Sequence, residues 1–428
     1  MNNKSFILPL SFILLFNAFI WVSCNGEKSS NSRDKSDSAK VNPAPEPSPI
    51  SNIKDSPFHV KVYMENSSSM EGYNNVNSNG FTSVISDLMY VYGSKNTQGY
   101  FFSNKLTKPY NAKNFSEKIS SKDVTYGDSS PFCEIMDSIL KKNESISFLI
   151  TDGIMSGSNK EIEKNPQHNI DMRETIQNEF SDKFRYYKDI AVSVYQFTSY
   201  FKGKYYCYNN YHKQLEVSNR PYYVFAIGKK KYVKDFADKV KSNSTELSHF
   251  IPKNEVHFGL LNIPMSPDFS MSPLSFRDTT DGFSFIIEKK EIPKLRKDGA
   301  LFSLTLPTDL PPYMRNQTYL DKHIHIMFNE DTIANAKLNE KYTNVINVKV
   351  PEKRFRKSSE NRIICQLEYA LPCWCDSASI DNDLKIFGNS FMQDKTFNLI
   401  YLIKGIKNGI ENSNAQNVWN IEYTIAIK

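Results

Sequence analysis

The sequence predicts an α/β domain followed by a β-rich domain. From Phe58 to about residue 243, short apolar runs alternate with stretches of helical period, which is typical of a sheet covered by helices. Beyond about Ser244, patterns of period two dominate, as expected for strands with one buried and one solvated face. The 428 residues leave room for two or three domains at roughly 100 to 200 residues each. We therefore expect a mostly parallel α/β sheet with helices on both faces in residues 57–243, and a β-rich, sandwich-like domain in residues 244–428.

The composition is that of a folded, aromatic-rich protein. It includes 24 Tyr and 29 Phe but 16 Gly, which argues against collagen-like, coiled-coil and wholly disordered chains. Lys and Arg number 53 against 47 Asp and Glu, so the formal net charge of +6 is small beside the total number of charges. Because a dedicated nucleic-acid binder needs a strong basic surface, we expect no nucleic-acid partner.

The N-terminus predicts export. After Lys4, residues 6–22 form an uncharged apolar run, which is the pattern of a signal peptide covering residues 1–23. The run is marginal for a membrane-spanning helix of about 20 residues, and a polar tract follows it instead of a stop-transfer pattern.

The end of this run, Ser23 followed by a lone Cys24, resembles the lipobox of bacterial lipoproteins, with Trp21 where that family usually has a smaller aliphatic residue. The resemblance implies that Cys24 becomes the lipidated N-terminus and holds the chain at a membrane. It implies a place in a bacterial cell envelope, and Asn25 favours the outer membrane. The alternative is ordinary secretion, with Cys24 removed or left free.

Residues 24–56 are expected to form a stalk. They consist mainly of Ser, Asn, Asp, Lys and Pro, and the proline run from Pro43 to Pro49 favours extended geometry. Such a segment buries too little apolar surface to offset the entropy of ordering.

The elements of the α/β domain follow from periodicity. The strand at 147–151 lies in an almost continuous apolar run, as expected when helices cover both faces of a sheet. The helix at 131–142 carries apolar residues three and four positions apart, which gives it one buried face. The predicted strands span residues 59–64, 100–103, 147–151, 190–197 and 222–227. The predicted helices span residues 81–92, 131–142, 170–187 and 231–241.

Oxygen-bearing side chains follow two of these strands. Glu65, Ser67 and Ser69 come after the first strand, and Asp152 follows the strand at 147–151. In open α/β sheets the functional crevice lies beyond the carboxyl ends of the strands. Carboxylate and hydroxyl oxygens without His or thiolate suit Mg²⁺ or Mn²⁺ better than zinc.

This pattern resembles the von Willebrand factor A domain, a Rossmann-type fold, and its metal-ion-dependent adhesion site. The family's first motif, Asp-x-Ser-x-Ser with Met and Gly nearby, is echoed from Glu65 to Gly72, and its Thr-Asp-Gly by residues 151–153. Its Gly-Thr element, which opens a helix, has its nearest equivalent in Gly127 and the serines after it. The resemblance covers about residues 57–243, and the sequence departs from the family with Glu for Asp at position 65 and Ser for Thr in the middle element.

The resemblance implies a site that recognises a protein. Ser67, Ser69 and a hydroxyl from Ser129 or Ser130 would coordinate Mg²⁺ or Mn²⁺, with Glu65 and Asp152 acting directly or through water. One position would stay open for an acidic side chain of a partner protein. The same residues are also compatible with a degenerate site in which the serines form an ordinary polar turn and cap a helix.

The remaining patterns predict structure more than chemistry. The segment from Tyr200 to Pro221 is rich in Tyr, Asn and Lys, which favours a hairpin, with a contact surface as an additional hypothesis. His323 and His325 are expected on one strand face and, without an identifiable third ligand, are interpreted as structural or surface residues. Strands are predicted at 302–306, 323–326, 346–350, 365–369 and 419–425, and a helix packed on their sheet at 397–410.

We therefore expect a membrane-tethered envelope lipoprotein whose α/β domain binds a protein. The sequence lacks the glycine and histidine motifs of common hydrolases, so we do not expect an enzyme. An exported metal-dependent hydrolase and a structural envelope protein with a degenerate metal site remain the alternatives.

Overall fold

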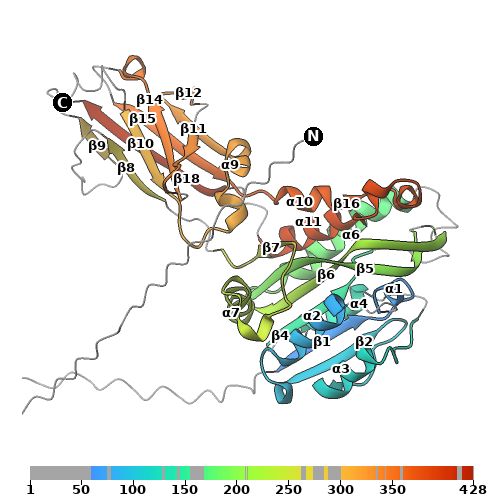
Figure 1. Ribbon diagram of the computed structural model, residues 1–428. Coiled ribbons are helices and arrows are strands. Elements are labelled where there is room, and N and C mark those ends of the chain that lie inside the picture. Colours follow the sequence, from blue (N-terminus) through green and yellow to red (C-terminus); the bar gives the residue numbers. More distant parts are fainter. Residues whose placement is uncertain are drawn as a thin grey trace, which may run out of the picture. The chain divides into compact units, whose positions relative to one another are not determined.

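Figure 1 shows the computed structural model. The structure describes residues 59–74, 79–127, 130, 132–141, 145–154, 168–207, 209, 211–261, 267–272, 284–287, 300–333, 336–342, 344–356, 360–411 and 417–427. The predicted signal peptide, the stalk, Cys24 and Ser129 lie outside the described residues.

A seven-stranded mixed sheet forms the centre of the α/β part, in the order β3-β2-β1-β4-β6-β5-β7. The pairs β1–β2 and β1–β4 are parallel, and the remaining pairs of this sheet are antiparallel. The prediction of a mostly parallel sheet is therefore wrong. The strands are β1 (Val60–Glu65), β2 (Thr97–Phe102), β3 (Tyr110–Asn111), β4 (Ile146–Thr151), β5 (Ile190–Tyr206), β6 (His212–Lys229) and β7 (Asn254–Phe258).

The longest antiparallel pair of the sheet is the hairpin of β5 and β6, which follow each other directly in the chain. A short connection can only join antiparallel strands, whereas parallel neighbours need a crossover. This arrangement also places β6, rather than β5, beside β4.

Helices cover both faces of the sheet. On one face the apolar sides of α2, α3 and α7 pack against residues such as Val62 and Phe148, and on the other α4, α6 and α11 pack against residues such as Leu149 and Phe225. All six residues of β4 are buried, as its apolar run predicts. The helices are α1 (Glu71–Asn74), α2 (Asn79–Tyr90), α3 (Ala112–Ser120), α4 (Phe132–Lys141), α6 (His168–Arg185), α7 (Lys230–Lys241) and α11 (Leu399–Ile410).

The helix α11 forms where the sequence predicts one, but it does not pack on the β-rich sheets. It lies side by side with α6, as Figure 1 shows, and its apolar residues join the core of the α/β part. Gly405 and Gly409 face the α6 backbone so closely that a Cβ atom at either position would lie within 2.7 Å of a carbonyl oxygen. Together with β7, α11 places elements from beyond residue 243 in the α/β part.

The β-rich part consists mainly of two sheets over a common apolar core. Their orders are β13-β14-β10-β8 and β12-β11-β15-β18-β9, and their pairs are antiparallel except for β18–β9. The strands are β8 (Asp268–Ser272), β9 (Ser284–Ile287), β10 (Ala300–Thr305), β11 (Ile324–Phe328), β12 (Asp331–Thr332), β13 (Ala336–Leu338), β14 (Val345–Val350), β15 (Asn361–Glu368) and β18 (Asn417–Ile427). The shorter elements of this part are α9 (Gln317–His323), η4 (Pro312–Arg315) and η5 (Glu352–Arg354).

The α/β part contains further short elements that pack with its sheet and helices. They are η1 (Ser94–Asn96), η2 (Thr245–Leu247), α10 (Cys373–Ser377), β16 (Ser379–Ile380), η6 (Asp383–Phe387), η7 (Ser390–Met392) and β17 (Thr396–Phe397).

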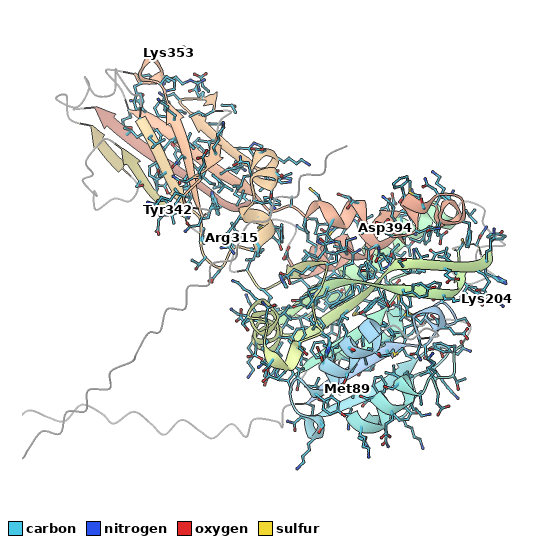
Figure 2. The ribbon with its side chains drawn as sticks, viewed as in Figure 1. Met89, Lys204, Arg315, Tyr342, Lys353 and Asp394 are labelled. Carbon is cyan, nitrogen blue, oxygen red and sulfur yellow. The ribbon has the colours of Figure 1, made fainter. Side chains whose placement is uncertain are left out.

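The predicted hairpin at Tyr200 to Pro221 is confirmed as the outer part of β5 and β6. Its strands run past the end of β4, since Thr151 already pairs with Tyr223 and Tyr223 with Gln196. The ten residues of β5 beyond Gln196 correspond to roughly 30 Å of strand. Figure 2 labels Lys204, which lies in this outer part of the β5–β6 hairpin.

Candidate functional site

The candidate metal site lies at the carboxyl ends of two adjacent parallel strands. Glu65 is the last residue of β1 and Thr151 the last residue of β4, and Met64 pairs with Ile150 in the register just before them. Because these strand ends meet at one edge of the sheet, the structure brings together the two motifs that the sequence analysis singled out.

The Glu65 carboxylate lies at the centre of a cluster of hydroxyl groups. Its side chain is 3% exposed. Ser67 Oγ donates to Oε1 at 2.6 Å, and Thr151 Oγ1 donates to Oε2 at 2.5 Å. Ser69 Oγ lies 2.9 Å from Ser67 Oγ. Three hydroxyls from two strand ends thus form a connected set with one carboxylate.

The loop after β1 is held in place by the segment that precedes α4. The Gly127 N–H donates to the Asn66 carbonyl at 2.9 Å, and the Ser68 N–H donates to the Gly127 carbonyl at 2.8 Å. The hydroxyl of Ser130, from the same segment, gives Glu65 a hydrogen bond that opposes the rise in the pKa of Glu65. Ser130 Oγ is buried without a hydrogen-bond partner of normal geometry. The structure therefore brings Ser130 to the site, whereas Ser129, the other serine that the sequence left open, lies outside the described residues.

Asp152 supplies the second carboxylate. It is 2% exposed, and its Oδ1 accepts a hydrogen bond from the Ile154 N–H at 3.0 Å. The Ser69 hydroxyl also donates to it, which connects Asp152 to the serine loop. Gly153 has a φ of 72°, a conformation that favours glycine and turns the chain sharply after Asp152.

Burial makes these two carboxyl groups hard to ionise together. Burial first, and then the Asp152 charge, raise the pKa of Glu65 to about 8. Burial also raises the pKa of Asp152. The hydrogen bonds that Asp152 accepts from Ser69 and from the Ile154 N–H lower this pKa, but burial has the larger effect. Without a cation the pair therefore tends to retain a proton, because a buried charge costs free energy unless it is compensated.

The structure adds one residue that sequence reasoning missed, Arg220. Its side chain is fully buried, and Nη1 donates to the carbonyl oxygens of Gln393 and Lys395 at 2.7 and 2.8 Å. The guanidinium carbon lies 4.6 Å from the centre of the Tyr205 ring. Arg220 acts on the nearby Asp152 carboxylate and lowers its pKa. No sequence motif marked it, because its position depends on the β5–β6 register and on the segment around residue 394.

The donor set fits a hard divalent cation. The groups that meet at the site are two carboxylates and the hydroxyls of Ser67, Ser69, Ser130 and Thr151, all of them oxygen ligands such as Mg²⁺ and Mn²⁺ prefer. In the part of the chain that the structure describes, no three His, Cys, Asp or Glu side chains are grouped to hold a metal ion. The candidate site differs from such groups because four of its six oxygen-bearing side chains are hydroxyl residues.

The two histidines are placed differently from the prediction. His323 ends α9, whereas His325 lies in β11. Nδ1 of His323 lies 3.3 Å and Nε2 of His325 lies 3.2 Å from the two oxygens of Glu368. Each imidazole therefore has a carboxylate neighbour, which supports a structural role for the pair.

The five described cysteines, Cys133, Cys207, Cys365, Cys373 and Cys375, are free. Cys133 lies on α4 with its thiol largely buried, and burial raises the pKa of the thiol to about 12. A thiol in this state is a weak nucleophile.

Comparisons with models of protein families, with curated proteins and with solved structures found no match for this chain. None of the described helices has the length and apolar character that crossing a membrane requires.

Proposed function

We propose that this protein is a membrane-tethered envelope lipoprotein whose α/β part, a domain like von Willebrand factor A, binds a partner protein through Mg²⁺ or Mn²⁺. In this proposal Ser67, Ser69 and Ser130 coordinate the ion, and Glu65 and Asp152 hold it directly or through water. An acidic side chain of the partner completes the coordination shell.

The observation that carries the proposal is the convergence of three separate segments on one buried carboxylate. Residues 65–69, the segment ending at Ser130 and residues 151–152 all place oxygen ligands around Glu65. Two buried carboxylates with one buried arginine nearby leave a net negative charge when both are ionised. A divalent cation would neutralise this charge, and the metal would supply the Lewis-acid contact for the partner's carboxylate.

Calorimetric titration of the protein with Mg²⁺ and Mn²⁺ tests the metal site. We expect binding by the wild type and none by Asp152→Ala. Asp182→Ala is a matched control, because Asp182 is an exposed aspartate on α6 that contacts Arg185. Identical heats for wild type and Asp152→Ala would contradict the metal site.

Affinity capture from membranes tests the partner. A protein retained with Mg²⁺, but lost both with a chelator and with Asp152→Ala, is the expected result. Equal capture under all of these conditions would contradict recognition through a metal.

Radiolabelled palmitate tests the tether. We expect incorporation into the wild type and none into Cys24→Ala. Label that survives in Cys24→Ala would exclude lipidation at this residue.

A second candidate function is that of a structural envelope protein in which the site holds no metal. The observation that favours it is Arg220, a buried cation that already compensates part of the carboxylate charge. Under this alternative the Asp152→Ala variant would still bind its partner. Titration of the wild type with Mg²⁺ or Mn²⁺ would then give only the heat of dilution.

A further inference from the structure

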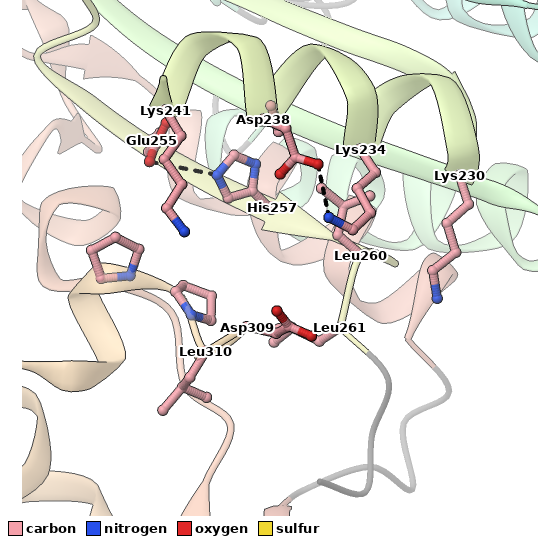
Figure 3. Close-up of a pocket in the computed structure, with 13 residues that line it drawn as sticks. Lys230, Lys234, Asp238, Lys241, Glu255, His257, Leu260, Leu261, Asp309 and Leu310 are labelled. Atoms are coloured by element: carbon pink, nitrogen blue, oxygen red, sulfur yellow. Dashed lines mark hydrogen bonds and ion pairs between the residues drawn. The ribbon is translucent and has the colours of Figure 1, made fainter. Parts of the chain in front are cut away.

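A second candidate site is lined by residues of both the α/β part and the β-rich part, and it contains none of the candidate metal-site residues. A cavity of about 200 Å³ opens between α7, the end of β7 and the stretch around Leu310 (Figure 3). At about 30 Å³ per water, this volume corresponds to roughly seven water molecules. It would accept a molecule of the size of an amino acid.

One side of the cavity is a charged stripe of α7. Lys230, Lys234, Asp238 and Lys241 recur at intervals of four, four and three residues, which places them along one side of the helix. The apolar residues of α7 form a different stripe, which is buried against the sheet. The cavity therefore meets the polar side of the helix.

Some of the charges are already paired. Lys234 Nζ lies 2.9 Å from Asp238 Oδ2, and Nε2 of His257 lies 3.6 Å from Glu255 Oε1. His257 is further oriented by Ser193, whose Oγ lies 2.8 Å from Nδ1. These pairs give the cavity wall a fixed arrangement of charges.

Two charges of opposite sign have no ion-pair partner among the residues that the structure describes. Lys241 makes no such pair, and Asp309 acts on Lys234, whose pKa is raised first by Asp238 and then by Asp309. Figure 3 shows Lys241 reaching toward the gap from α7 and Asp309 on its opposite side. Asp309 thus acts on Lys234 only electrostatically, since Lys234 is already paired with Asp238, and Lys241 has no ion-pair partner among the described residues.

Apolar groups complete the wall. The side chains of Leu260, Leu310, Pro311 and Pro312 line the cavity beside these charges. Small-molecule sites characteristically combine an apolar wall with a few polar groups that fix the orientation of the ligand.

We propose that this cavity binds a small zwitterion of amino-acid size with an apolar side chain. Its carboxylate meets the Lys241 ammonium, its ammonium group meets the Asp309 carboxylate, and its side chain lies against Leu260 and the prolines. This site is independent of the candidate metal site.

The test uses the full-length protein and three related probes in calorimetric titration: leucine, N-acetylleucine and leucinamide. Leucine carries both charges, and each of the other two probes lacks one of them. We expect leucine to bind at least about tenfold more tightly than either analogue, because each analogue leaves either Lys241 or Asp309 without its charged partner. Equal affinity for the three probes, or no measurable binding of leucine, would overturn the proposal.

Two variants assign the ends of the ligand. Lys241→Met is expected to remove the preference for leucine over leucinamide, which lacks the carboxylate. Asp309→Asn is expected to remove the preference for leucine over N-acetylleucine, which lacks the ammonium group. Lys231→Met is the matched control, since Lys231 lies on the same helix but does not line the cavity. If Lys231→Met lowers the affinity for leucine as much as Lys241→Met does, a general charge effect explains the binding. That result would contradict the proposed site.

Discussion

Glu65 makes the stability of the metal-free protein depend on pH. Its pKa is raised to about 8 in the folded state, mainly by burial, so the folded protein holds this proton more tightly than the unfolded chain does. The contribution of Glu65 to stability is therefore fully present below its unfolded pKa of about 4.5, and is lost as the pH rises toward 8.

We expect Glu65→Gln to remove this dependence, because glutamine stays neutral and can still accept hydrogen bonds. Denaturant unfolding with a chelator, at several pH values between 5 and 8, measures the effect. The wild type should lose stability relative to Glu65→Gln as the pH rises. A constant difference between the two proteins across this range would show that Glu65 does not titrate in this window.

Arg220 is expected to stabilise the fold by compensating buried carboxylate charge. Arg220→Met should lower the free energy of unfolding by about 3 to 5 kcal/mol at neutral pH, the usual cost of removing one partner from a buried ionic arrangement. Arg220→Lys should restore part of this loss, since it keeps the charge but not the planar contact with Tyr205. Thermal and denaturant unfolding of both variants measures this loss of stability. If Arg220→Met is as stable as the wild type, Arg220 does not compensate buried carboxylate charge.

The residues of the candidate site differ in how far the sequence could predict them. Glu65, Ser67, Ser69 and Asp152 follow apolar strands closely, so their local pattern was enough to select them. Arg220 lies in a hairpin among many tyrosines and lysines, and its neighbours come from residues about 170 positions further along the chain. No local pattern encodes such a contact.

At the scale of elements, the contact between α6 and α11 depends on glycine. A Cβ atom at Gly405 would lie 2.7 Å from the Gln177 carbonyl oxygen, which is too close without a shift of one helix. We expect Gly405→Leu to lower the free energy of unfolding by about 3 kcal/mol, the upper end for an overpacked core, despite leucine's better helix propensity.

Gly388→Leu is the matched control for this prediction. No atom lies within 4 Å of a Cβ atom at Gly388, and its φ is negative, so the substitution should be nearly neutral. Denaturant unfolding compares the two variants. If both lose the same stability, the close approach of the helices is not what Gly405 provides.

Element types were more predictable than element partners. The apolar spacing from Phe397 to Ile410 indicated a helix, and α11 forms there, but a buried stripe does not say which surface covers it. In the same way, the apolar runs of β5 and β6 predicted strands correctly, but the predicted parallel pairing is wrong for both of them. The short connection between them makes this pair antiparallel, and β2–β3, β4–β6 and β5–β7 are antiparallel as well.

At the scale of the whole molecule, the α/β part is built from distant stretches of the chain. We expect a fragment of residues 57–243 to unfold without a cooperative transition or to aggregate, because it lacks β7 and exposes the side of α6 that α11 covers. Residues 57–428 should unfold cooperatively. Calorimetric scans and size-exclusion chromatography of both fragments test this, and a cooperatively folded 57–243 fragment would contradict it.

Local patterns in the sequence predicted the types of most elements, the α/β character of the first part, five strands of the second part, and four side chains of the candidate site. These features depend on local periodicity and on residues that immediately follow a strand, so neighbours in the chain are sufficient to specify them. Tertiary contacts set the antiparallel direction of β6 beside β4, the place of α11 on α6, and the presence of Arg220 near Asp152. Each of these depends on contacts between residues far apart in the chain, which local patterns do not determine.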